Sequence, residues 1–204
     1  MIAIIDYGSG NVHAVSTLLE KQNIKHCLTD DIVTLKSSDK YILPGVGAFD
    51  PSMKTLRETG LLETLNEEVL VNKKPVLGIC VGMHLLSEGS DEGQEVGLGW
   101  ISGRVRKIQL SEDMPPPRLP HMGWNSINPK KDTPLFNNID MDHGFYFLHS
   151  YYFDAANSAD IAAEVEFGSD MTCAVIKDNI FGMQFHPEKS HSNGMKLFSN
   201  FAAL

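Results

Sequence analysis

The sequence predicts an α/β fold with a mixed, mostly parallel sheet that is flanked by helices and has an antiparallel edge. In the first half of the chain, short β-rich runs alternate with stretches of helical periodicity, a pattern typical of a parallel sheet covered on both faces. In the second half, β-rich runs follow one another with only turn residues between them, which favours antiparallel pairing. The length of 204 residues fits one domain, spanning residues 1–204, with a sizeable core.

The elements of the first half follow from local hydrophobic patterns. The expected strands are Met1–Asp6, Tyr41–Leu43 and Pro75–Ile79, and the expected helices are Val12–Gln22 and Leu61–Val71. A further helix is expected to begin at Asp50-Pro51. Aspartate at position 50 would be its N-cap, and proline is favoured at the first helical position.

Turn residues divide the second half into short strands. The segments Met114–Pro117 and Asp132–Asn138 are expected to be loops. The expected strands are Gly103–Leu110, Phe145–Phe153, Ile161–Phe167, Thr172–Lys177 and Ile180–Phe185. The residues 177–179 between the last two strands predict a hairpin, and an amphipathic helix is expected at Asn193–Ala202.

The bulk composition excludes several classes of function. A formal net charge of -9 argues against nonspecific nucleic-acid binding. The three cysteines, Cys27, Cys80 and Cys173, have no paired spacing, which predicts free thiols in a reducing compartment, the cytoplasm. The first residues run directly into an expected strand without the basic start of a signal peptide. Because no apolar run reaches roughly 18 residues, no membrane span is expected.

The segment Pro75–Leu86 carries the strongest chemical signal. An apolar strand ends at Cys80 and an apolar helical pattern begins at once, with Gly78 and Gly82 on either side. This is a G-x-nucleophile-x-G elbow with cysteine in place of serine, and the glycines permit its tight turn. Such a turn exposes the sulfur beside a helix N-terminus, which favours the thiolate. The alternative is a buried core cysteine between two packing glycines, which is the preferred interpretation for the other two cysteines.

A second signal lies at residues 181–190. His186 and Glu188 are two residues apart, so they would share one face if the preceding strand continued that far. The carboxylate could then orient the imidazole and stabilise its charged form, which completes a catalytic triad with Cys80. The alternative is a strand-end histidine followed by a surface glutamate, and the cysteine elbow is what favours the triad.

A glycine-rich loop, Pro44-Gly45-Val46-Gly47, follows another short apolar run. Backbone N–H groups at the end of a strand can point at a developing oxyanion. The N–H of Val81, the residue after the nucleophile, is the natural second donor. Taken alone, a loop of this composition is more often a simple turn.

The patterns for metals and cofactors are incomplete. Tyr7–Gly10 begins like a dinucleotide-binding loop, but His13 stands where the third glycine belongs. The eight histidines form no zinc pattern, and Cys80 with His84 gives only two candidate ligands. The sequence therefore predicts no metal and no cofactor.

The two chemical signals together resemble a known enzyme family. GICVGM around Cys80 and QFHPEKS around His186 are similar to the two catalytic signatures of class I glutamine amidotransferases. Other segments resemble one branch of that family, the glutaminase subunits of imidazole glycerol phosphate synthase. These segments are Asp6–Asn11, Pro44–Phe49, Pro120–Asn125 and Phe145–Tyr151, and the similarity covers nearly the whole chain.

The resemblance implies an activity, a partner and roles for single residues. Enzymes of this branch hydrolyse glutamine to glutamate and ammonia, and a (βα)8-barrel synthase subunit, bound as a heterodimer, uses the ammonia in histidine biosynthesis. In this chain the resemblance implies that Gly45–Gly47 rearranges on activation and that Glu92 holds the amino group of glutamine. It further implies that His149, Ser150 and Tyr151 bind the other end of the substrate, and that Met122 and Trp124 face the partner.

Two departures from the family pattern matter. Val81 and His84 stand where the family usually has leucine and glutamine. Because that glutamine is thought to hold substrate, His84 predicts an altered substrate affinity rather than inactivity. The segment Glu188–Gly194 resembles a variant branch associated with amidation of surface sugars, so a second acceptor for the ammonia stays open. A cysteine hydrolase of another substrate and a noncatalytic binding module are the rival functions, and Trp124 could instead be a core residue.

Overall fold

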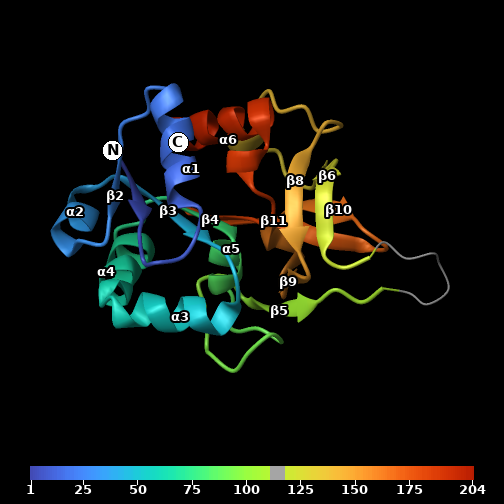
Figure 1. Cartoon of the computed structure of the whole chain (residues 1–204), viewed down its shortest axis with the longest axis horizontal. Helices are drawn as coiled ribbons and strands as arrows, with labels where there is room; N and C mark the ends of the chain where they lie inside the picture. The colour runs from blue at the N-terminus through green and yellow to red at the C-terminus, as the bar shows by residue number, and fades with distance from the viewer. Residues whose placement is uncertain (111–117) are drawn as a thin grey trace.

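An eight-stranded mixed sheet forms the centre of the molecule (Figure 1). The computed structural model describes residues 1–110 and 118–204, so the expected loop Met114–Pro117 lies outside the described residues. The strands in spatial order are β2 (His26–Thr29), β1 (Ile2–Ile5), β3 (Lys40–Gly45), β4 (Val76–Cys80), β12 (Ile180–Met183), β11 (Asp170–Lys177), β10 (Ile161–Glu166) and β7 (Asn128–Pro129). Pairing is parallel from β2 to β12 and antiparallel from β12 to β7. The predicted mostly parallel sheet with an antiparallel edge is confirmed.

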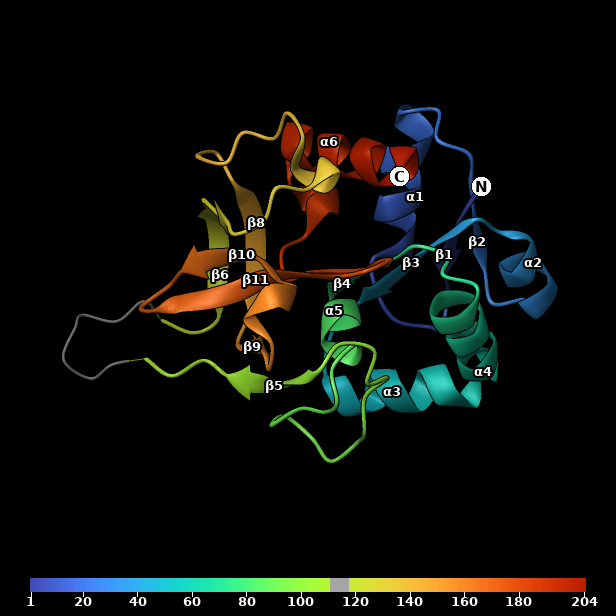
Figure 2. The same ribbon diagram turned by 180° about the vertical axis from the view of Figure 1, so that it is seen from behind.

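Helices cover both faces of this sheet (Figures 1 and 2). One face carries α1 (Val12–Lys21) and α6 (His191–Ala203), and the other carries α3 (Phe49–Glu58), α4 (Leu61–Asn66) and α5 (Val81–Leu85). A short helix, α2 (Ile32–Ser37), lies at the edge beside β2. Single helical turns are η1 (Glu67–Val71, a π-helix), η2 (Pro134–Phe136), η3 (Ser158–Asp160) and η4 (Pro187–Lys189).

Two antiparallel ribbons lie beside the antiparallel half of the main sheet. They pair β5 (Gly103–Lys107) with β9 (Tyr151–Ala155), which packs against β11, and β6 (His121–Asn125) with β8 (Phe145–His149). The expected strand Phe145–Phe153 is therefore two strands that separate at Ser150. This break allows the chain to leave one ribbon and enter the other beside the end of the main sheet.

Asp50 is not the N-cap of α3, as the sequence suggested. The N-cap is Ala48, and Asp50 lies in the first turn of the helix. Its carboxylate instead accepts the backbone N–H groups of Gln94 and Glu95, at 2.8 and 3.0 Å. The carboxylate thus satisfies amides of a distant loop, which a local capping rule does not consider.

The turn from β4 into α5 is held by close backbone packing. In the register of β3 and β4, Gly45 lies opposite Cys80. A Cβ atom on Gly82 would lie 1.8 Å from the carbonyl oxygen of Leu43, so α5 can approach β3 this closely only with glycine at that position. The packing therefore sets the expected nucleophile next to the expected oxyanion loop.

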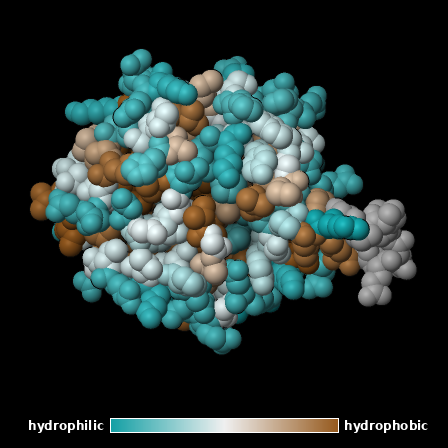
Figure 3. Space-filling view, in the orientation of Figure 1, coloured by the Kyte–Doolittle hydropathy of each residue, from teal (hydrophilic) through white to brown (hydrophobic). Residues whose placement is uncertain are grey.

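The surface seen in Figure 3 is mainly hydrophilic, although hydrophobic atoms break it along a band across the middle. Large side chains that remain exposed include Met122, Trp124 and Leu148 on the β6–β8 ribbon. In the described part of the chain, no helix is long and apolar enough to cross a membrane.

Candidate active site

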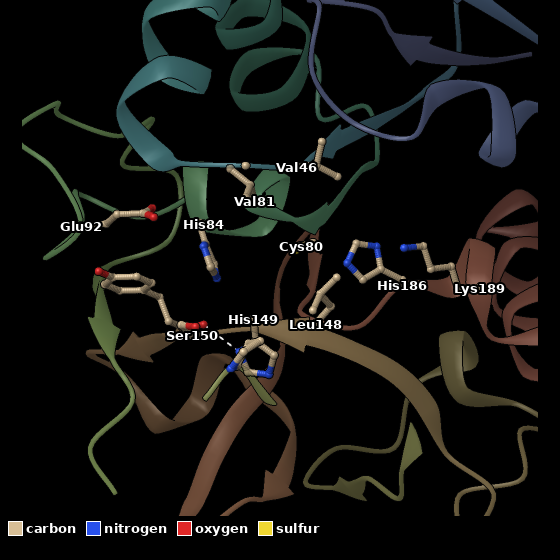
Figure 4. A pocket seen from close by; sticks show the side chains of 13 residues that line it. Val46, Cys80, Val81, His84, Glu92, Leu148, His149, Ser150, His186 and Lys189 are labelled. Atoms are coloured by element: carbon tan, nitrogen blue, oxygen red, sulfur yellow. Dashed lines mark hydrogen bonds between the residues drawn. The ribbon is translucent and has the colours of Figure 1, made fainter. Parts of the chain in front are cut away.

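A cavity of about 350 Å³ lies where β4 ends and α5 begins (Figure 4). It brings together most of the residues that the sequence singled out. Its lining includes Val46, Gly47, Cys80, Val81, His84, Glu92, His149, Ser150, Tyr151 and His186, together with Pro120, Leu148 and Lys189. Met122 and Trp124 are not part of the lining.

Cys80 occupies a strained turn. Its backbone angles are φ 54° and ψ -112°, which a residue with a side chain rarely adopts. Only 5% of the residue is exposed, and it lies at the wall of the cavity beside Val81 and His186 (Figure 4). Because Val81 is the first residue of α5, its N–H has no acceptor within the helix. The turn thus offers a sulfur and a backbone donor to the same space.

His186 and Glu188 form a buried pair, with Nδ1 of the imidazole 2.8 Å from the carboxylate. The premise that the strand continues this far is wrong, because β12 ends at Met183 and the pair is instead brought together by η4. Burial alone would lower the pKa of His186, but hydrogen bonding and charge attraction from Cys80 and Glu188 outweigh it and raise the pKa well above its ordinary value. The imidazole is therefore a charged group at neutral pH.

The Gly45–Gly47 loop, which the sequence predicts to be an oxyanion loop, is held by Ser9. The N–H of Val46 donates to Oγ of Ser9 at 3.3 Å, and the Ser9 hydroxyl donates back to the Val46 carbonyl at 3.1 Å. Gly47, the next residue, has φ +89°. In this structure the Val46 N–H is therefore engaged by Ser9 rather than free for a ligand in the cavity.

The two ends of the cavity carry opposite charges. Glu92 lies at one end and Lys189 at the other (Figure 4). One carboxylate oxygen of Glu92 accepts the N–H of Phe49 at 2.9 Å, which fixes the side chain at the start of α3. The other oxygen has no such commitment and can accept a hydrogen bond from a positively charged ligand group.

Three further histidines near the cavity are buried and have no acidic hydrogen-bond partner among the residues that the structure describes. Nε2 of His84 lies 2.7 Å from the side-chain oxygen of Gln184. His149 uses both ring nitrogens, one toward the Tyr151 carbonyl at 2.8 Å and one toward Nδ1 of His121 at 2.9 Å. Burial lowers the pKa of His84 and of His121 to about 4, and that of His149 to about 3. These three rings are neutral at pH 7.

Three residues of the site, Ser9, Gln184 and Lys189, were not among the candidates that the sequence patterns predicted. Gln184 and Lys189 lie inside the QFHPEKS segment, two residues before and three residues after His186, so their proximity to the site was a usable signal. Ser9 lies in the DYGSGN segment, but its contact with Val46 spans 37 positions and has no local signature.

We expect the folded chain to lose stability as the pH falls from about 6.5 to about 4. Below about pH 6.5, His84, His121 and His149 bind protons in the unfolded chain but stay neutral in the folded chain. Each of them therefore lowers the free energy of unfolding by up to about 1.4 kcal/mol per pH unit. Urea unfolding at a series of pH values measures this slope. His84→Gln should reduce the slope, whereas His13→Gln, at an exposed position of α1, should not. A slope that His84→Gln leaves unchanged would contradict the assignment.

Among residues 1–110 and 118–204, no group of three or more histidine, cysteine, aspartate or glutamate side chains could hold a metal ion.

Solved structures with the same fold include a crystal structure of glutamine amidotransferase, with a TM-score of 0.74 and 16% identity, covering 100% of this chain and 99% of that one. PurLQS from Thermotoga maritima aligns with a TM-score of 0.72 and 18% identity over 99% of this chain and 97% of that one. At these identities the likeness shows the fold.

Sequence relatives extend over the full length of the chain. It is 44% identical to "Imidazole glycerol phosphate synthase subunit HisH" of Leptospira borgpetersenii and 45% identical to the subunit of the same name from Leptospira interrogans, each over 100% of both chains. It is 44% identical, again over 100% of both chains, to "Imidazole glycerol phosphate synthase subunit HisH 2" of Pseudomonas aeruginosa. The family model "Glutamine amidotransferase class-I" matches residues 3–203. The chain therefore belongs to the class I glutamine amidotransferases.

Proposed function

We propose that the chain is the glutaminase subunit of an imidazole glycerol phosphate synthase. It hydrolyses glutamine to glutamate and ammonia and passes the ammonia to a (βα)8-barrel synthase subunit, with which it forms a heterodimer in histidine biosynthesis. The observation that carries the proposal is the buried His186–Glu188 pair beside the strained Cys80 in one cavity. The full-length similarity to subunits of that name supports the choice of substrate and partner.

The mechanism follows from the charge of His186. Charged imidazole beside Cys80 favours the thiolate, which attacks the carboxamide carbon of glutamine. His186 gives its proton to the nitrogen as the C–N bond breaks, so ammonia leaves and a glutamyl thioester remains. The neutral imidazole then takes a proton from water, which attacks the thioester and releases glutamate. Glu188 keeps the ring oriented throughout.

The oxyanion of each tetrahedral intermediate needs backbone donors. Val81 supplies one N–H, and the Gly45–Gly47 loop supplies another once Val46 is released from Ser9. A donor of this kind lowers the barrier by roughly 2.7–4 kcal/mol. While Ser9 holds Val46, the site lacks the second backbone donor for the oxyanion. The subunit alone should therefore be a poor glutaminase.

The substrate is held between the two ends of the cavity. The free oxygen of Glu92 receives the α-amino group of glutamine, and Ser150 with the backbone around it contacts the other end of the substrate. His149 supports this segment through its hydrogen bond to the Tyr151 carbonyl, since both its ring nitrogens are occupied within the protein.

The partner covers the β6–β8 ribbon. Met122 is 65% exposed and Trp124 is 40% exposed, which favours the interface role over a core position for Trp124. Enclosing the cavity mouth there would keep ammonia from water, where it would protonate. The proposal places both subunits in the cytoplasm, where Cys80 stays reduced.

Cys80 is expected to be the residue that reacts. Cys80→Ser should fold normally and release no glutamate from glutamine. The serine hydroxyl stays protonated at neutral pH, whereas the proposed nucleophile is a thiolate. An electrophilic glutamine analogue should label Cys80 alone, as read by peptide mass spectrometry. Labelling of Cys27 or Cys173 instead would sink the assignment.

Releasing the oxyanion loop is expected to raise the partner-free activity. Ser9→Ala removes the hydroxyl that holds Val46, so glutamate release by the chain alone should rise about two- to tenfold, the effect of losing one hydrogen bond. Ser9→Thr keeps the hydroxyl and is the matched control. Rates are compared for the chain alone, with partner, and with partner plus acceptor; wild-type rates that are equal in all three would refute the regulated loop.

The ammonia acceptor is tested in cells. A histidine auxotroph that lacks this glutaminase, supplied with the chain and its cognate synthase, should grow without histidine, whereas the Cys80→Ser chain should not support growth. The alternative acceptor, a surface sugar, rests on the resemblance of the segment Glu188–Gly194 to the variant branch. His191 of that segment stacks on Trp124 with ring centroids 5.4 Å apart, so the segment lies on the proposed partner face. Failure to grow, with both proteins soluble and the glutaminase active in vitro, would favour that alternative.

A further inference from the structure

Gln184 lies directly behind the nucleophile and takes no part in the mechanism above. Its side chain is fully buried and its amide nitrogen contacts Sγ of Cys80 at 3.9 Å. Its amide oxygen lies 2.7 Å from Nε2 of His84. The amide therefore bridges the reacting sulfur and the histidine that replaces the usual glutamine of the family.

The backbone of Gln184 is fixed by a hydrogen bond, so the orientation of its side-chain amide determines whether the NH₂ group or the oxygen faces Sγ of Cys80. The Gln184 N–H donates to the carbonyl of Cys173 at 2.8 Å, which continues the pairing of β12 with β11. A neutral His84 that donates from Nε2 to the amide oxygen leaves the NH₂ group facing Cys80. The reversed amide would set a carbonyl oxygen against a thiolate, which repels it. His84 is neutral because burial lowers its pKa to about 4.

We propose that Gln184 is a further catalytic residue, which donates a hydrogen bond to the sulfur of Cys80. His84 is the positioning residue that holds the amide in the donating orientation. A hydrogen bond to the charged form of a group favours that form, so the amide adds to the stabilisation of the thiolate. The contact is long, so its effect is smaller than that of His186. This inference rests on the proposed role of Cys80 as nucleophile.

The other titratable groups that face the sulfur are His186, from the segment after β12, and Tyr7, from the loop after β1. Neither contacts His84 or the Gln184 amide through a hydrogen bond in the described residues. Substitutions at positions 84 and 184 therefore change the polar contact to Cys80 while leaving these two groups in place.

The test measures the thiolate of Cys80 through the pH dependence of its alkylation by iodoacetamide, from about pH 5 to about pH 10. Mass spectrometry reads the Cys80 peptide, and the partly exposed Cys27 in the same chain is the internal control. Gln184→Met keeps the size of the side chain but removes the donor. The pH at which Cys80 alkylation reaches half its maximal rate, the Cys80 midpoint, should therefore rise by about 0.5 to 1 pH unit. His84→Gln should keep the wild-type midpoint, because a glutamine at that position can also donate to the Gln184 oxygen.

His84→Leu should move the Cys80 midpoint upward by a smaller amount, and the double variant with Gln184→Met should move it no further than Gln184→Met alone. An unchanged midpoint in Gln184→Met would overturn the role of the amide, and equal shifts in His84→Leu and His84→Gln would overturn that of His84. If Gln184→Met does not fold, His84→Leu decides: a shift supports the proposal and no shift overturns it. Alkylation needs no glutamine hydrolysis, so failure of the glutaminase function would show separately, as absent glutamate release by a chain whose Cys80 midpoint still shifts.

Discussion

The close approach of α5 to β3 is the constraint on which the rest of the active site depends. The carbonyl oxygen of Leu43 occupies the space where a Cβ atom on Gly82 would lie, so the helix begins immediately after the strand. Cys80 is forced into a conformation that costs about 1–3 kcal/mol. The surrounding sheet tolerates this strain because β4 is fully buried and pairs with β3 on one side and β12 on the other. The strain in turn aims the sulfur and the Val81 N–H at the cavity.

The same region connects the Glu92 end of the cavity to the Gly45–Gly47 loop. Glu92 accepts the N–H of Phe49, and Phe49 is two residues beyond Gly47. Asp50, one residue further, accepts two amides from the loop that carries Glu92. The carboxylate that would hold the amino group of glutamine and the loop that would hold the oxyanion therefore share one attachment point at the start of α3. Movement of Gly45–Gly47 has a direct physical route to the substrate site.

The sequence reveals those features whose signals are local. The elbow at Cys80 and the two-residue spacing of His186 and Glu188 are visible in short segments, and the pair forms even though a helical turn replaces the expected strand. Features that depend on long-range contacts could not be predicted. Gln184 meets His84 across 100 positions, and the Asp50 carboxylate is used by a loop 44 positions away instead of by its own helix. The division of one expected strand into two at Ser150 also depends on long-range contacts, because β8 pairs with β6 whereas β9 pairs with β5.

The protonation states of the histidines fit the acid and base steps proposed for this cavity. His186 has two acidic neighbours, Cys80 and Glu188, and they raise its pKa despite its burial. In the described part of the chain, the two hydrogen-bond partners of His149 are neutral. These bonds require a neutral ring, because one nitrogen donates to a carbonyl while the other must accept from His121. A proton added to His149 would break that chain and set a second positive charge near His186. Among the described histidines of the cavity, His186 is therefore the one that is charged, and in the proposed mechanism it is the proton donor to the leaving nitrogen.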